Sequence, residues 1–171
     1  SRPPGHHCLP DYPNGFCLLA NIAIAIDSAI SENFGKKFCV VDWDVHHGNG
    51  TEAIFYDRDD VLTISIHQER NYPVDTGMEI DRGKGEGLGY NVNLPLPAGS
   101  GHSTYLNVFD KVITPLVNNY RPDIIIVACG FDAAMIDPTS SMLCSAETFR
   151  ILTRKAQALA DKNCNGKLSL I

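Results

Sequence analysis

Phe38-Cys39-Val40-Val41-Asp42-Trp43-Asp44-Val45-His46-His47-Gly48-Asn49-Gly50 is the stretch that decides the fold. Its apolar start, 38–41, predicts a buried β-strand, and the glycines at its end predict a turn. Because side chains alternate between the two faces of a strand, Asp42, Asp44 and His46 would point the same way if the strand geometry persists. Carboxylates at strand ends often cap the next helix, but such a dense group of Asp and His favours a functional site.

The composition indicates an ordinary globular domain. The chain has 171 residues, which suits one domain with a sizeable core. Charged residues make up 20% and hydrophobic residues 44%, as is typical of soluble proteins. The net charge of −6 argues against a phosphate-binding surface. We therefore expect no direct contact with nucleic acid.

The apolar segments and cysteines bear on the compartment. The most apolar long stretch, Phe16 to Ile30, is too short and too polar to span a bilayer, so we expect no membrane association. The six cysteines form no Cys-x-x-Cys pair, which favours a reducing compartment. We expect a cytoplasmic location, or a nuclear one if the source is eukaryotic.

Helices and strands are expected to alternate along the chain. Apolar residues recur at helical spacing in three segments, and a short fourth helix is expected to start with Thr51 as its N-cap. The expected helices are 16–33, 51–56, 103–118, with a bend near Pro115, and 146–161. The expected strands are 38–42, 61–66, 91–94, 123–129 and an incomplete one at 167–171. This order predicts an α/β fold with a mostly parallel sheet and helices on both faces.

Three potential metal ligands follow two of these strands. Asp44 and His46 follow the strand at 38–42, and Asp132 follows the strand at 123–129. Ligands bind outside the carboxyl ends of the strands in such sheets, and a catalytic zinc commonly takes three His or carboxylate ligands. The adjacent pair His6-His7 would then supply acid/base groups, since imidazole titrates near neutrality.

Several motifs resemble those of the histone deacetylase family, class II branch, and of the related bacterial deacetylase-like amidohydrolases. Acetylpolyamine amidohydrolases and acetoin-utilisation proteins are more distant relatives. The resemblance extends over nearly the whole chain. The motifs are Arg-Pro-Pro-Gly-His-His at 2–7, Gly-Phe-Cys at 15–17, Val-Asp-Trp-Asp-Val-His-His-Gly-Asn-Gly-Thr at 41–51, Ser-Ile-His-Gln at 65–68, Tyr-Pro-Val-Asp-Thr-Gly at 72–77 and Gly-Phe-Asp at 130–132.

The resemblance implies an arginase-like three-layer fold and zinc-dependent hydrolysis of acetyl-lysine or a similar acyl amide. The substrate would be an acetylated lysine side chain or an acetylated small amine. It implies one zinc held by Asp44, His46 and Asp132, with His7 as the general base beside His6. Asp42 would orient His6, and Asn49 would face His7. The expected walls of the substrate tunnel are Gly15, Phe16 and Tyr72.

The resemblance also implies two structural potassium sites. One would use Asp42, the Ser65 hydroxyl and the backbone oxygens of Asp44, His46 and Ile66. The other would use the backbone oxygens of Phe55, Arg58, Val61 and Tyr90.

The sequence departs from the family at its ends. The family's Gly-Gly-Tyr motif, whose tyrosine helps to polarise the substrate carbonyl, is expected just beyond Ile171, and strands are expected before Arg2. We therefore expect residues 1–171 to be the central part of one catalytic domain, incomplete at both ends. The isolated chain is expected to associate, as an oligomer or with the absent segments, and to have very low activity.

Two alternatives stay open. An arginase-like amidinohydrolase would need two metals and further bridging carboxylates, but Ala134 stands where such an acid would be expected. Alternatively, the chain binds metal or a partner without catalysing a reaction. The identity of the acyl substrate does not follow from the sequence.

Overall fold

One parallel sheet of five strands forms the centre of the molecule. The computed structural model describes residues 3–171, so Arg2 of the first family motif lies outside the described part. The strand order is β3-β2-β1-β4-β5, and all neighbours run parallel, which confirms the predicted sheet. The strands are β1 Phe38–Asp42, β2 Val61–Gln68, β3 Asn91–Leu96, β4 Ile124–Ala128 and β5 Leu168–Leu170.

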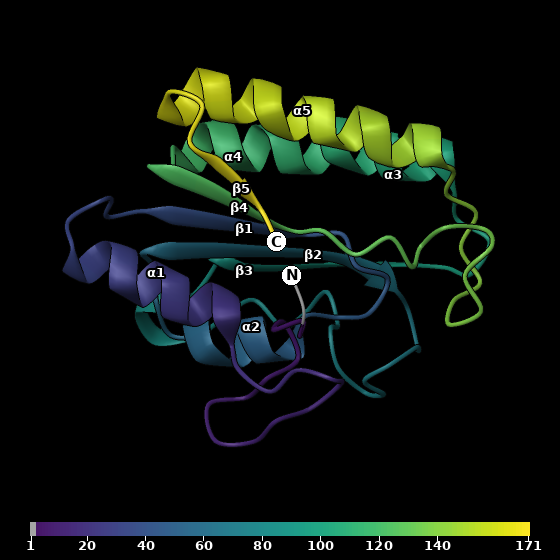
Figure 1. Ribbon diagram of the computed structural model, residues 1–171, viewed down its shortest axis with the longest axis horizontal. Helices are drawn as coiled ribbons and strands as arrows, with labels where there is room; N and C mark the ends of the chain where they lie inside the picture. Colours follow the sequence, from purple (N-terminus) through teal and green to yellow (C-terminus); the bar gives the residue numbers. More distant parts are fainter. Residues whose placement is uncertain (1–2) are drawn as a thin grey trace.

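Helices cover both faces of this sheet (Figure 1). Helices α1 and α2 lie on one face, and α3, α4 and α5 lie on the other. Their bounds are α1 Asn21–Ser31, α2 Asn49–Phe55, α3 His102–Val108, α4 Thr114–Tyr120 and α5 Ala146–Cys164; a short 3₁₀ turn, η1, spans Gly85–Gly87.

Alternation along β1 explains the two cores. Phe38 and Val40 are buried in the cluster that contains Ile22 and Ile26 of α1. Cys39 and Val41 face the opposite way, into the cluster formed with α3 to α5. Because β1 has neighbours on both sides and helices on both faces, all five of its residues are buried.

The strand order reverses direction at β1. Strands β2 and β3 lie on one side of β1, and β4 and β5 lie on the other. In open α/β sheets, the crevice at such a switch point is the usual place for a ligand. We therefore expect a ligand-binding site at the carboxyl ends of β1 and β4.

Two predicted helix starts are wrong. Helix α1 begins at Asn21 rather than Phe16, because residues 14–17 form a tight turn in which Phe16 has a φ of 61°. Thr51 lies inside α2, and Gly48 takes the N-cap position. The helix therefore starts two residues before the expected one, directly within the His-rich motif.

The expected helix 103–118 is interrupted. A π-helical turn, η2 Phe109–Ile113, separates α3 from α4 and ends two residues before Pro115. Proline cannot donate the backbone hydrogen bond that continues an α-helix, and its ring crowds the carbonyl four residues earlier. Helix α5 is three residues longer than expected and ends at Cys164. In residues 3–171, no helix is long and apolar enough to cross a membrane.

Candidate metal centre

The chain leaves strand geometry at Asp42. The strand geometry on which the alignment of Asp42, Asp44 and His46 depended does not persist beyond Asp42, although Asp42 and Asp44 both face His6. Asp42 instead folds back over the loop, and its Oδ1 accepts the backbone N–H of Asp44 at 3.0 Å. A carboxylate at a strand end commonly binds the loop that follows it in this way. Asp44 and His46 turn towards the end of β4.

Asp44, His46 and Asp132 form one group. His46 Nδ1 lies 3.0 Å from Asp44 Oδ1 and 2.9 Å from Asp132 Oδ2. One ligand atom from each residue lies within 4.8 Å of the others, and all three side chains are partly buried. Two loops that are far apart in the sequence therefore deliver three ligand atoms to one point.

Close packing between the two loops brings these ligands together. The backbone N–H of Val45 donates to Asp132 Oδ1 at 2.7 Å, which leaves Oδ2 to face His46. Gly130 permits the approach, since a Cβ atom there would lie 2.3 Å from Asp44 Oδ2. A larger residue at Gly130 would push the end of β4 away from Asp44.

The chemistry of the three ligand atoms fits a zinc ion. Burial lowers the pKa of His46, but hydrogen bonds to Asp132 and Asp44 outweigh this effect and raise the pKa to about 10. The two carboxylates therefore create a strong negative potential at the imidazole. One histidine nitrogen and two carboxylate oxygens, with further positions open to the cavity, match the ligand types of a catalytic zinc.

The adjacent histidines lie beside this group and are held differently. His6 Nδ1–H donates to Asp42 Oδ2 at 2.7 Å, whereas His7 Nδ1 lies 2.8 Å from the Oδ1 atom of Asn49. The centres of the two rings are 3.9 Å apart. The loop that carries the histidines is fixed at the start of α2, where the N–H groups of residues 50 and 51 donate to the His6 carbonyl.

The two neighbours give these histidines opposite pKa shifts. Burial lowers the pKa of His6, but the charge of Asp42 and the hydrogen bond to it prevail and raise the pKa to about 9. Burial and the positive charge of His6 lower the pKa of His7 to about 4, against the opposing hydrogen bond to Asn49. At neutral pH, His6 is protonated and His7 is neutral.

A cavity of about 630 Å³ opens over the histidines and the metal ligands. Its mouth is formed by Phe16, which is 94% exposed, and by Tyr72, which is partly exposed. The Tyr72 ring stands edge-on to His7, with 5.1 Å between ring centres. The lining residues are Pro4, His6, His7, Gly15, Phe16, Asp44, His46, Tyr72, Asp132, Asp137 and Thr139.

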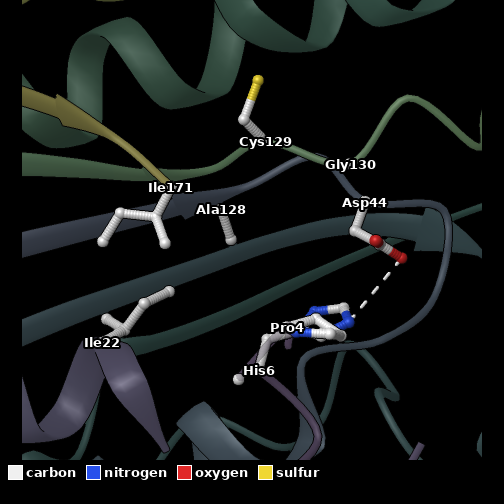
Figure 2. Close-up of a pocket in the computed structure, with 9 residues that line it drawn as sticks. Pro4, His6, Ile22, Asp44, Ala128, Cys129, Gly130 and Ile171 are labelled. Carbon is white, nitrogen blue, oxygen red and sulfur yellow. Dashed lines mark ion pairs between the residues drawn. The ribbon is translucent and has the colours of Figure 1, made fainter. Parts of the chain in front are cut away.

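A second, smaller cavity of about 140 Å³ lies on the inner side of His6 and Asp44 (Figure 2). His6 Nε2 and Asp44 Oδ1 are 3.8 Å apart at its polar end. Ile22, Ala128 and Ile171 supply its apolar wall. The site thus has a wide outer cavity and a narrow inner one.

The residues expected to coordinate potassium ions lie in two separate places of the structure. Ser65 is paired with Asp42 in the sheet, and its hydroxyl lies 2.9 Å from His67 Nδ1. In the second place, the carbonyl of Phe55 accepts the N–H of Arg58, and the carbonyl of Tyr90 accepts the N–H of Thr63. Val61 begins β2, and Ile66 is buried within it.

The sequence did not predict several polar contacts that the structure shows near the site. His47 Nδ1 lies 2.9 Å from Thr76 Oγ1, and its Nε2 lies 3.3 Å from Glu52 Oε2. Asn14 binds the Tyr72 hydroxyl. The dipeptide Asn14-Gly15 is a strong signal for a tight turn and could have indicated that turn. No comparable signal pairs Thr76 with His47, because the pairing depends on loop conformation.

Comparison with known proteins places this geometry in a family. The histone deacetylase domain model matches residues 1–171. A histone deacetylase-like amidohydrolase of Pseudomonas aeruginosa is 44% identical over 171 residues, which cover 100% of this chain and 45% of that protein. The chain therefore belongs to the histone deacetylase family, as its motifs predicted.

Solved structures agree with this assignment. The crystal structure of the HDA15 HD domain superposes with a TM-score of 0.89 at 38% identity, over 99% of this chain and 49% of that one. An acetylpolyamine aminohydrolase from Burkholderia pseudomallei superposes with a TM-score of 0.88 at 36% identity, over 99% and 48% of the two chains. The chain spans about half the length of the relatives that it matches.

Proposed function

We propose that the protein hydrolyses acetyl-lysine or a similar acyl amide in a zinc-dependent reaction, and that residues 1–171 are the central part of its catalytic domain. The observation that carries the proposal is the convergence of Asp44, His46 and Asp132 with the His6-His7 pair in one cavity. The substrate is an acetylated lysine side chain or an acetylated small amine. Membership of the family supports this class of reaction.

A zinc ion held by Asp44, His46 and Asp132 would act as a Lewis acid on the amide carbonyl and would lower the pKa of the attacking water. His7 takes the proton of that water, because it is neutral and faces the cavity. It then returns the proton to the leaving amine. His6, protonated against Asp42, supplies positive charge where negative charge develops on the carbonyl oxygen.

The two cavities define the orientation of the substrate in this proposal. The amine chain enters through the outer cavity, between Phe16 and Tyr72. The inner cavity beside His6 and Asp44 accommodates a small acyl group. We also propose that the two groups of backbone and side-chain oxygens implied by the resemblance hold structural potassium ions, the first of them around Asp42 and Ser65.

Replacing His7 by alanine in the full-length protein tests this assignment. His7→Ala should abolish deacetylation of an acetyl-lysine peptide while the protein still binds zinc, because His7 is not among the metal ligands. His102→Ala is the matched control, since His102 bonds to Thr148 and does not line the outer cavity. A His7→Ala variant with an unchanged rate would refute the assignment.

Two other functions are less well supported. A two-metal amidinohydrolase needs carboxylates that bridge the ions, whereas among residues 3–171 one group of three His and Asp side chains lies close enough together to hold a metal ion. A non-catalytic metal-binding role would leave the arrangement of His7, Asn49 and the outer cavity without a purpose. Metal analysis that finds two ions per chain would favour the first alternative.

A further inference from the structure

The Tyr72 hydroxyl is bound by a residue of the turn 14–17. It donates a hydrogen bond to the side-chain oxygen of Asn14 at 2.5 Å. The ring of the same residue stands edge-on to His7 and lies 6.2 Å, between ring centres, from His46. The hydroxyl thus holds the ring, and the ring lines the outer cavity beside His7.

Asn14 is well placed to hold this hydroxyl. It is the first residue of the turn 14–17, whose ends are joined by Asn14 and Cys17 through backbone hydrogen bonds in both directions, at 3.2 and 2.7 Å. Gly15 and Phe16, the two central residues, both have positive φ. A Cβ atom on Gly15 would lie 2.2 Å from the His7 ring, so the turn is pressed against that histidine. The Asn14 side chain therefore projects from a backbone that is itself fixed.

The loop that carries Tyr72 is also bound on its other side. Asn71 donates from its side-chain nitrogen to the Thr139 carbonyl at 3.2 Å, and its side-chain oxygen accepts the N–H of Tyr72. Thr139 belongs to the segment that lines the outer cavity opposite the turn 14–17. Three separate segments thus meet at the cavity mouth. The side-chain hydrogen bond from Tyr72 to Asn14 joins two of these segments beside His7.

The two aromatic walls differ in how they are held. Phe16 is 94% exposed at the tip of its turn, so its ring can move among rotamers. Tyr72 is 40% exposed and is fixed at its hydroxyl end. Of the two rings at the mouth, Tyr72 is therefore the one that a hydrogen bond holds in place, and Asn14 accepts that bond.

We propose that Asn14 is a positioning residue that determines substrate specificity: by holding the Tyr72 hydroxyl, it keeps the Tyr72 ring in place at the mouth of the outer cavity and favours slender, unbranched amine chains. The inference rests on the proposed function and assigns the amine side of its substrate to linear alkyl amines. Amines with a ring close to the amide are excluded because they need the space that the fixed Tyr72 ring occupies.

The test compares two substrates in the full-length, zinc-loaded protein. One is a linear N-alkylacetamide, and the other is N-(cyclohexylmethyl)acetamide. The wild type should prefer the linear compound in kcat/KM. Asn14→Leu and Tyr72→Phe should each reduce this preference about three- to tenfold, the range expected for the loss of one hydrogen bond, and the effect should fall more on KM than on kcat.

Further variants separate a specific role from general damage. Asn14→Asp keeps an acceptor oxygen and should retain the preference, and the double variant of Asn14→Leu with Tyr72→Phe should lose no more than either single one. Tyr12→Phe, which removes an exposed hydroxyl from the same loop, should change nothing. An unchanged preference in Asn14→Leu, or a loss of preference in Asn14→Asp, would overturn the proposal.

Calorimetric binding of both compounds to the His7→Ala variant, with and without Asn14→Leu, separates this inference from the proposed function. One outcome is that the wild type hydrolyses neither compound, while Asn14→Leu removes a preference in binding. This result would refute the proposed hydrolase activity and support the role of Asn14. Hydrolysis by the wild type with the same preference in Asn14→Leu would refute the role of Asn14 alone. Failure of both compounds to bind would overturn both.

Discussion

The carboxylates at the two ends of the strands differ in their partners. At the amino ends, Asp60 forms an ion pair with Arg58 at 2.8 Å, and Asp123 accepts the backbone N–H groups of residues 36 and 37. At the carboxyl ends, Asp42, Asp44 and Asp132 lie near histidines. Within residues 3–171, none of these three forms an ion pair with Lys or Arg.

This difference separates structural from functional acids. Arginine keeps its charge at all relevant pH values, so a carboxylate paired with it is permanently satisfied. A carboxylate whose charged partner is an imidazole can have that partner replaced by a metal ion or changed by a proton. The comparison predicts that substitutions of acids at the carboxyl ends of the strands affect metal binding and catalysis. Substitutions of acids or their partners at the amino ends should affect only stability.

The largest effect is expected for Asp132→Ala. This change removes one metal ligand and also the acceptor for the Val45 N–H, so the variant should lose stoichiometric zinc and all measurable hydrolysis. Metal analysis of the purified protein checks the outcome. Asp137→Ala, which removes another acid from the same cavity, should retain zinc. Full zinc occupancy in Asp132→Ala would contradict the comparison.

A smaller effect is expected for Asp42→Asn. The amide keeps the shape of the carboxylate but lacks the charge that holds His6 protonated. Activity should fall about 10- to 100-fold, as is usual for residues that support catalytic or metal-binding groups, while zinc stays bound. Steady-state kinetics together with zinc content distinguish this result from simple unfolding. A rate equal to that of the wild type would show that Asp42 is merely structural.

Arg58→Met should change stability alone. It removes a two-point ion pair with Asp60 and a contact with Asp27 on a partly exposed surface, while it preserves much of the aliphatic side chain. Exposed ion pairs contribute little, so we expect a loss of up to about 1 kcal/mol in the free energy of unfolding. Urea denaturation measures it. A large loss of zinc in this variant would break the distinction between the two ends.

The smallest effect is expected at Asp123, and it should depend on pH. The hydrogen bonds from the N–H groups of Lys36 and Lys37 lower the pKa of this carboxyl in the folded state. Because the folded pKa is depressed, its contribution is present above the unfolded pKa of about 3.9 and disappears as the pH falls through the folded value. Asp123→Ala should therefore cost about 0.5 kcal/mol at neutral pH, the lower end of the range for a hydrogen bond because the site is exposed, and almost nothing in strong acid. A cost that stays constant with pH would contradict this explanation.

The sheet could be predicted from the sequence because its strands are apolar and bounded by polar residues. The run 38–42 forms β1 as expected, and the alternation of strands and helices gives the parallel order. The sequence predicts a helix from Phe16, but Phe16 and Cys17 belong to the turn 14–17, in which Phe16 adopts a left-handed backbone conformation. The dipeptide Asn14-Gly15 favours this turn locally, and the apolar pattern that follows it does not reveal where the helix begins.

Likewise, only part of the candidate site could be predicted from the sequence. The ligand group of Asp44, His46 and Asp132 followed from residue types placed after strands whose ends meet in space. The contacts of Asn14 with Tyr72 and of His47 with Thr76 join loops, and loop conformation carries no periodic signal in the sequence. The roles assigned to individual residues stay predictions until the substitutions above are measured.

The hydrogen bond from the Val45 N–H to Asp132 has a consequence for the order of folding. It joins residues 87 positions apart in the chain, and contacts of such long range form only after the intervening segments have been organised. We therefore expect the metal ligands to assemble late in folding, and part of the free energy of binding the proposed zinc ion would be free energy of folding. Zinc uptake during refolding would then report the docking of β4 against β1.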